Sequence, residues 1–153
     1  SGDSLFNGDD HLDRQYLSIV SFNTSALPNT AVIHCATLRL FWAGAVGSDP
    51  YWSLRSIDIR KPFFGASALL LAEDFQAPPS LSSIGPLLVN ETYSDGFLRA
   101  AAFPYFNLTG STQFRVRYEE DDNDNKSADY VILYSGEAQT QYRPLLTVYY
   151  YVP

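Results

Sequence analysis

The chain has 153 residues, a length typical of one domain with its own core. Hydrophobic residues make up 46% of it and aromatic residues 15%, which argues against disorder. No apolar run approaches the roughly 18–20 residues that a membrane-spanning helix needs. The net charge of −7 argues against a nucleic-acid partner, whose phosphates require a basic surface.

In chain order, residues 1–13 are polar and turn-rich, and they predict an N-terminal arm or loop ahead of a single domain over 14–153. Apolar runs bounded by turn residues then predict strands at Tyr16–Phe22, Val32–Trp42, Leu54–Arg60, Leu87–Thr92, Phe97–Ala102, Gln113–Tyr118, Tyr130–Tyr134 and Leu145–Val152. One short helix is predicted over Ala66–Phe75, and a loop over Ala77–Pro86. Regular strands with little helix predict an all-β antiparallel sandwich or jelly roll.

A resemblance to a known family runs from about Arg14 to the end. The segments that carry it are Arg14–Pro28, Ala31–Ile33, Ala36–Leu40, Asp58–Lys61, Phe63–Gly65, Ala72–Ala77, Thr112–Arg117, Ala128–Tyr130, Tyr134–Gly136 and Tyr142–Val148. In this order they resemble the DNRLRE-type extracellular modules. The resemblance implies a jelly-roll β-sandwich in a secreted or surface-anchored protein, and some relatives of this kind bind carbohydrate.

The start of the chain departs from that family pattern. Such modules have a further strand ahead of the segment that matches Arg14 onward, whereas only thirteen polar residues precede it here, and the chain contains no Met. We therefore expect a processed chain or a segment of a longer protein, with a sandwich that lacks its first strand. The open edge would be covered by the parent chain or by a strand from a neighbouring molecule.

The residues that could support catalysis are few. His34 and Cys35 fall within an apolar predicted strand, and His11 lies in the acidic arm. The chain has no nucleophile elbow, metalloprotease helix motif or phosphate-binding loop. Cys35 is the single cysteine, so no disulfide can form within the chain. We predict that the protein is not an enzyme and requires no cofactor.

The densest group of acidic residues lies in Glu119–Asn125, which holds five of the 17 acids. Hard oxygen ligands suit Ca²⁺, and the candidate ligands are Asp121, Asp122, Asn123 and Asp124. With Asp121 as the first position of an EF-hand loop, Lys126 stands where the motif has Gly and Ile132 where it has Glu. The loop is therefore not an EF-hand. The alternative is a solvated hairpin loop without a metal. Asp9, Asp10 and Asp13 form a second acidic group.

Four of the seven asparagines lie in the N-glycosylation signal Asn-x-Ser/Thr, an excess over chance: Asn23, Asn90, Asn107 and Asn125. All four fall in predicted loops or strand ends, where a glycan has room. Because Asn, Ser and Thr are all common in turns, their co-occurrence alone is the alternative explanation.

Aromatic residues suggest a binding surface. In the last strand, Tyr149 and Tyr151 share one face, and Tyr142 precedes the strand. Tyr51 and Trp52 form a second candidate in a Gly/Pro-rich loop. Exposed aromatic rows are typical of protein interfaces and of platforms that stack on sugars. The alternative is a thick core with ordinary surface tyrosines.

Two functions are compatible with these patterns. The first is an extracellular or cell-surface structural module, a glycosylated protomer that packs against copies of itself or adjacent domains of a parent chain in a fibre or surface layer. The second is a carbohydrate-binding module that holds polysaccharide on tyrosine and tryptophan rings, supported by Ca²⁺.

Overall fold

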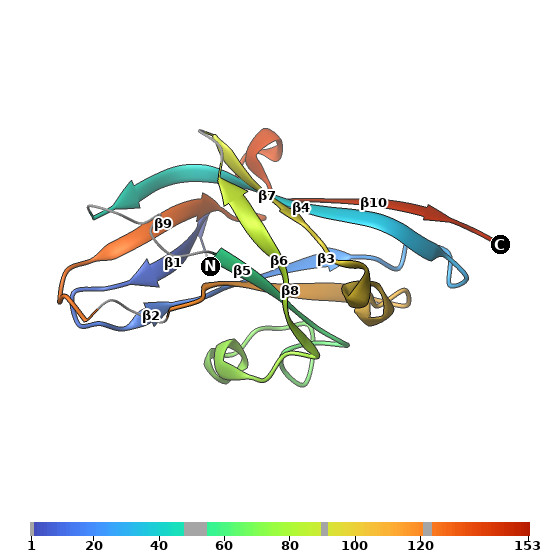
Figure 1. Cartoon of the computed structure of the whole chain (residues 1–153), viewed down its shortest axis with the longest axis horizontal. Coiled ribbons are helices and arrows are strands. Elements are labelled where there is room, and N and C mark those ends of the chain that lie inside the picture. The colour runs from blue at the N-terminus through green and yellow to red at the C-terminus, as the bar shows by residue number, and fades with distance from the viewer. Residues whose placement is uncertain (1, 48–54, 90–91, 121–123) are drawn as a thin grey trace.

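The computed structural model describes residues 2–47, 55–89, 92–120 and 124–153. Its strands are β1 (Ser4–Asp9), β2 (Gln15–Tyr16), β3 (Ser18–Asn23), β4 (Val32–Val46), β5 (Arg55–Arg60), β6 (Leu81–Val89), β7 (Tyr93–Phe97), β8 (Ser111–Tyr118), β9 (Asp129–Tyr134) and β10 (Leu145–Tyr151). Three short 3₁₀ helices lie between them: η1 (Ala72–Gln76), η2 (Ala100–Tyr105) and η3 (Thr140–Tyr142). The protein is an all-β antiparallel sandwich, as predicted (Figure 1).

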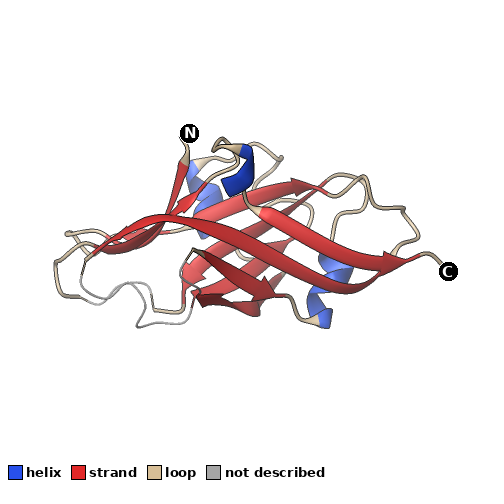
Figure 2. Ribbon diagram, turned by 90° about the horizontal axis from the view of Figure 1, so that it is seen from above, coloured by secondary structure: helices blue, strands red, loops and turns tan. Residues whose placement is uncertain are grey.

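The strands form one sheet that folds over into two layers (Figures 1 and 2). The first layer contains β1, β2, β4, β7, β9 and β10, and the second contains β3, β5 and β8. Its order is β2-β1-β9-β4-β7-β6-β5-β8-β3, and β10 adds to β4. β9 and β10 follow one another along one edge of β4, because β9 pairs with 42–46 and β10 pairs with 32–39. β6 joins the layers by pairing first with β5 and then, over 87–89, with β7.

The core lies between the layers. Alternating side chains of β4, β5, β8 and β9 point into it and are fully buried, among them Leu38, Leu40, Ile57, Ile59, Phe114, Val116, Val131 and Leu133. Phe114 makes edge-to-face contacts with Phe22 and Phe106. The strand predicted at Val32–Trp42 is confirmed as part of β4, which is central in its layer because it has neighbours along both edges.

An ionic network fastens the segment between β5 and β6 to the outer face of the second layer. Asp58 of β5 is fully buried and accepts hydrogen bonds from the guanidinium groups of Arg115 and Arg117 on β8, at 2.8 and 3.1 Å. Arg115 also donates to the carbonyl oxygens of Phe75 and Ala77. Burial works against ionisation of Asp58, but hydrogen bonds from Arg115, from the Ser83 amide and from Arg117 outweigh it and lower its pKa.

The turn from β1 to β2 is closed by a second ion pair. Arg14 contacts Asp10 at 2.6 Å, and the backbone amides of Leu12 and Arg14 donate to the same carboxylate. The hydrogen bond from the Arg14 side chain is the main reason why the pKa of Asp10 falls from 3.8 to about 2. The contribution of this carboxylate to folding is therefore complete above pH 3.8 and is lost as the pH falls through about 2.

Several predictions about individual segments are wrong. Residues 1–13 are not wholly an arm or loop, because Ser4–Asp9 form β1, which is hydrogen-bonded to β9. A strand therefore does precede Arg14, contrary to the expectation of a sandwich that lacks its first strand. The helix is limited to the 3₁₀ turn η1, at the end of the predicted Ala66–Phe75. The predicted loop Ala77–Pro86 contains most of β6, and η2 begins within the predicted strand Phe97–Ala102.

Candidate functional site on the outer face of β4, β7 and β10

The side chains of β4 point alternately to the core and to the outside, and this alternation determines which residues form the outer face of the first layer. Leu38 and Leu40 point to the core, so Thr37, Arg39 and Phe41 point outward. Thr37 lies opposite both Phe97 of β7 and Thr147 of β10, which extends the outward row across three strands. The residues of this surface, called here the outer aromatic face, are Val32, Phe41, Tyr93, Phe97, Tyr134, Tyr142, Leu145, Thr147, Tyr149 and Tyr151.

Ring contacts order one end of this face. Tyr142 stacks on Tyr134 with ring centroids 4.8 Å apart, and its edge approaches Phe41 at 6.3 Å. Phe41 in turn contacts Tyr93, and the guanidinium group of Arg39 lies 3.9 Å from the centre of the Tyr93 ring. Each ring is thus held by its neighbour, which fixes the rings before any partner arrives.

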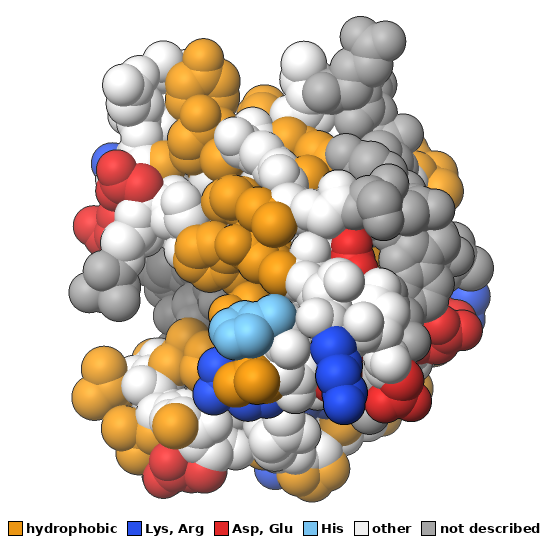
Figure 3. Space-filling model, turned by 90° about the vertical axis from the view of Figure 1, so that its left-hand side faces the viewer, with side chains coloured by type: hydrophobic (Ala, Val, Ile, Leu, Met, Phe, Trp, Pro, Cys, Tyr) orange, Lys and Arg blue, Asp and Glu red, His pale blue; other side chains and the backbone are white. Residues whose placement is uncertain are grey.

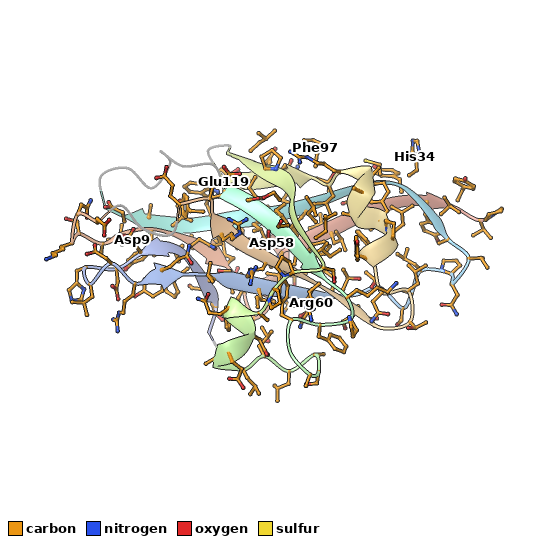
Figure 4. All side chains as sticks on the ribbon, turned by 60° about the horizontal axis from the view of Figure 1, so that its bottom comes forward. Asp9, His34, Asp58, Arg60, Phe97 and Glu119 are labelled. Atoms are coloured by element: carbon orange, nitrogen blue, oxygen red, sulfur yellow. The ribbon has the colours of Figure 1, made fainter. Side chains whose placement is uncertain are left out.

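The other end of the face is more exposed. Tyr149 lies opposite Cys35 and Tyr151 opposite Val32, with a bulge of β4 at His34 between the two pairs. The exposed fractions are 63% for Tyr149, 57% for Tyr151 and 58% for Phe97. Phe97 and His34 lie along the same margin of the molecule, away from Asp58 (Figure 4).

Tyr142, Tyr149 and Tyr151, which the sequence singled out together, therefore occupy one layer but do not form one cluster. Within the described part of the chain, ring contacts join Tyr142 to Tyr134 and Phe41, and none joins it to Tyr149 or Tyr151. The other two aromatic candidates, Tyr51 and Trp52, lie outside the described residues.

Charge on this face is neutralised locally. Arg39 donates two hydrogen bonds of 2.7 Å to the carboxylate of Asp95, and this contact raises the pKa of Arg39. The segment from Leu145 to Val152 contains no ionisable group other than its tyrosines. In a chain with net charge −7, this is a surface that another apolar surface or the flat face of a sugar can approach without desolvating an unpaired ion.

A second aromatic group lies at the far end of the same layer. The rings of Phe6, Tyr16 and Tyr130 are 5.5–5.9 Å apart in tilted and edge-to-face contacts. Tyr16 and Tyr130 pair across Gly8 of β1, which has φ 135° and no room for a side chain. Figure 3 shows hydrophobic side chains gathered near the middle of this end of the molecule.

Of the predicted calcium ligands, Asp121, Asp122 and Asn123 lie outside the described residues. Asp124 is exposed, with φ 55°. The loop that follows is fixed to the β1–β2 turn, because the Lys126 amide donates to the Asp13 carboxylate at 2.9 Å. Within the described ranges, no three His, Cys, Asp or Glu side chains converge as a metal site. In the second acidic group, Asp10 forms an ion pair with Arg14.

The predicted glycosylation sites differ in accessibility. Asn23 is exposed, and its Oδ1 accepts hydrogen bonds from the Ser25 amide and hydroxyl. Asn107 is only 9% exposed, and its Nδ2, the atom that would carry a glycan, donates to the Ser111 carbonyl. Asn125 is exposed, and its Nδ2 donates to Asp129. Asn90 lies outside the described residues.

We expect the folded protein, made in a cell with N-glycosylation, to carry a glycan on Asn23 and none on Asn107. A Cβ built on Gly110 would lie 2.9 Å from the Asn107 Nδ2, so there is little room for a glycan on this atom. Glycopeptide mass spectrometry of the folded protein measures the occupancy of each site. The Asn23→Gln variant should lose the mass of one glycan and Asn107→Gln should lose none. A glycan on Asn107 in folded protein would contradict the expectation.

The three residues that could support catalysis, His11, His34 and Cys35, do not form one site. His34 is exposed on β4, whereas His11 lies in the β1–β2 turn. Cys35 is partly buried and lies beside Tyr149, its cross-strand neighbour, on the same face of the sheet. A cleft of about 440 Å³ lies between β1, β3 and residues 135–144, with Leu5, Ile19, Val20 and Phe22 on its wall and Glu137 and Arg143 as its ionisable groups within the described part of the chain.

None of the described helices is long and apolar enough to cross a membrane. The chain matches no family model in a scan against protein families and no protein in a search of curated sequences.

Proposed function

We propose that the protein is a non-enzymatic structural module of the cell surface or extracellular space, whose copies associate through the outer aromatic face. The observation that carries the proposal is that exposed Phe97, Tyr149 and Tyr151 share one surface with Arg39, whose charge is neutralised by Asp95. Exposed apolar surfaces of this kind are typical of protein contacts. The resemblance to DNRLRE-type modules and the Asn-x-Ser/Thr signals support the extracellular location.

The experiment compares two charge substitutions at exposed apolar positions. Leu69 is 74% exposed in the segment that covers the other layer, so it provides a control for added charge alone. We expect the native chain to sediment as oligomers that grow with concentration. Phe97→Lys should raise the dissociation constant of the oligomers tenfold or more, because burying an ammonium group in the contact costs more than about 1.4 kcal/mol. Leu69→Lys should leave the association unchanged.

Sedimentation velocity gives the mass distribution, and negative-stain imaging shows whether the oligomers are regular. A native chain that stays a monomer at all concentrations would overturn the proposal. Equal weakening by Phe97→Lys and Leu69→Lys would also overturn it, because the association would then depend on net charge rather than on this face.

The alternative function is carbohydrate binding, favoured by the two exposed rings of Tyr149 and Tyr151 on one face of β10. Side chains two residues apart on a strand are separated by roughly 7 Å, so both rings can contact one saccharide chain. A glycan array probed with and without Ca²⁺ tests this function. Binding that is lost in Tyr149→Ala supports it, and a silent array under both conditions contradicts it.

A further inference from the structure

The outer edge of β10 is a long strand edge with unused hydrogen-bonding groups. β10 pairs with β4 along one edge, and no other described strand pairs with it. Its seven residues include no proline, lysine or acidic residue, which are the side chains that protect natural edge strands from pairing with another chain. An edge of backbone N–H and C=O groups is satisfied by another strand.

The other strand edges are better covered. β2 has two residues, and the first half of β3 is buried, with the Ser18 hydroxyl donating to the Phe6 carbonyl of β1. By contrast, the side chains of β10 are exposed or half-buried throughout. Leu146 and Val148 pack against the core but remain partly open to solvent, so a neighbouring strand would complete their burial.

We propose that β10 pairs antiparallel with β10 of a second copy of this chain, about a two-fold axis at Val148. The inference rests on the proposed self-association and names the contact that begins it. In this register Leu145 lies opposite Tyr151 of the second copy, Leu146 opposite Tyr150, and Thr147 opposite Tyr149. Each of these pairs joins a tyrosine to an aliphatic side chain or threonine on the same face, a favourable cross-strand combination.

The absence of charge allows a second copy to occupy this edge. Two chains of net charge −7 repel one another overall, and an uncharged contact such as the segment from Leu145 to Val152 adds no local repulsion. The pattern is also self-complementary under a two-fold rotation, as an isologous contact requires. Pairing would join the two outer aromatic faces into one continuous surface across the dimer.

Cysteine substitutions on a Cys35→Ser background test the register. Val148 of one copy faces Val148 of the other, at a Cα separation of about 4.5–5.5 Å, within the range of a disulfide. Two Leu145 residues would lie six positions apart along the strands, roughly 20 Å, which no disulfide spans. Under mild oxidation Val148→Cys should give a covalent dimer on non-reducing gels, and Leu145→Cys should remain monomeric.

Hydrogen exchange of the unsubstituted chain provides a test that does not depend on how the variants fold. The amides of β10 that point away from β4 should gain tenfold or more in protection as the concentration rises through the association range. If sedimentation shows oligomers while β10 protection does not change and Val148→Cys does not cross-link, the edge pairing is wrong and self-association stands. If the chain stays monomeric, both proposals are wrong.

Discussion

The Asp58→Ala variant is expected to lose about 3–5 kcal/mol of unfolding free energy. The substitution removes the acceptor of Arg115 and Arg117, and Arg115 is itself 6% exposed, so a nearly buried cation is left without its carboxylate. The Ser83 amide loses its partner as well. Through the Arg115 contacts to Phe75 and Ala77, the loss also loosens the segment between β5 and β6.

Asp95→Ala provides the matched control, since it removes the same kind of side chain from another arginine pair. Arg39 and Asp95 are partly exposed, and exposed pairs contribute about 0.2–1 kcal/mol. Urea unfolding followed by circular dichroism measures both variants. Equal losses would show that the Asp58 network has no special role.

The folded pKa of Asp58 is lowered, so the contribution of Asp58 to the unfolding free energy is complete above pH 3.8 and fades as the pH falls through the lower folded pKa.

The Gly8→Ala variant is expected to lose about 3 kcal/mol of unfolding free energy. Gly8 has φ 135°, a region almost restricted to glycine, and a Cβ built there lies 2.1 Å from the Asp129 carbonyl oxygen of β9. Because the contact is with backbone, either β1 or β9 must shift. Such a shift also separates Tyr16 from Tyr130, which meet over this position.

Gly136→Ala is the control for the glycine substitution, because nothing lies within 4 Å of a Cβ at that position. It should change the unfolding free energy by less than about 0.5 kcal/mol. Urea denaturation curves of the two variants give the comparison directly. A loss in Gly8→Ala as small as that in Gly136→Ala would mean that β1 contributes little to the stability of the sandwich.

The fold class could be predicted because local patterns determine it. The alternation in Gln113–Tyr118 and the two apolar faces of Val32–Trp42 identify strands without any knowledge of their neighbours. The same alternation places Asp58 and Arg115 on polar faces of two strands, but it does not reveal that they are paired directly across from each other. Their burial depends on a covering segment that packs there only in the folded chain.

Other features depended on long-range pairing. Ser4–Asp9 has little strand pattern, yet it forms six cross-strand pairs with β9. β6 contains Gly85 and Pro86, two residue types typical of loops. They fit into this strand because it passes at this point from β5 in one layer to β7 in the other. The outer aromatic face was partly visible in Tyr149 and Tyr151, whereas Phe97 and Phe41 join it only through the register of β4 and β7.

The orientation of β10 has a mechanical consequence. β4 and β10 run along the long axis of the molecule, and the chain leaves β10 at one tip (Figure 1). A pull on the C-terminal end along that axis loads the ladder between β10 and β4 in shear, so its hydrogen bonds resist together instead of opening one after another. Seven residues of β10 share the load. A strand placed across the axis would peel away from its end at a much lower force.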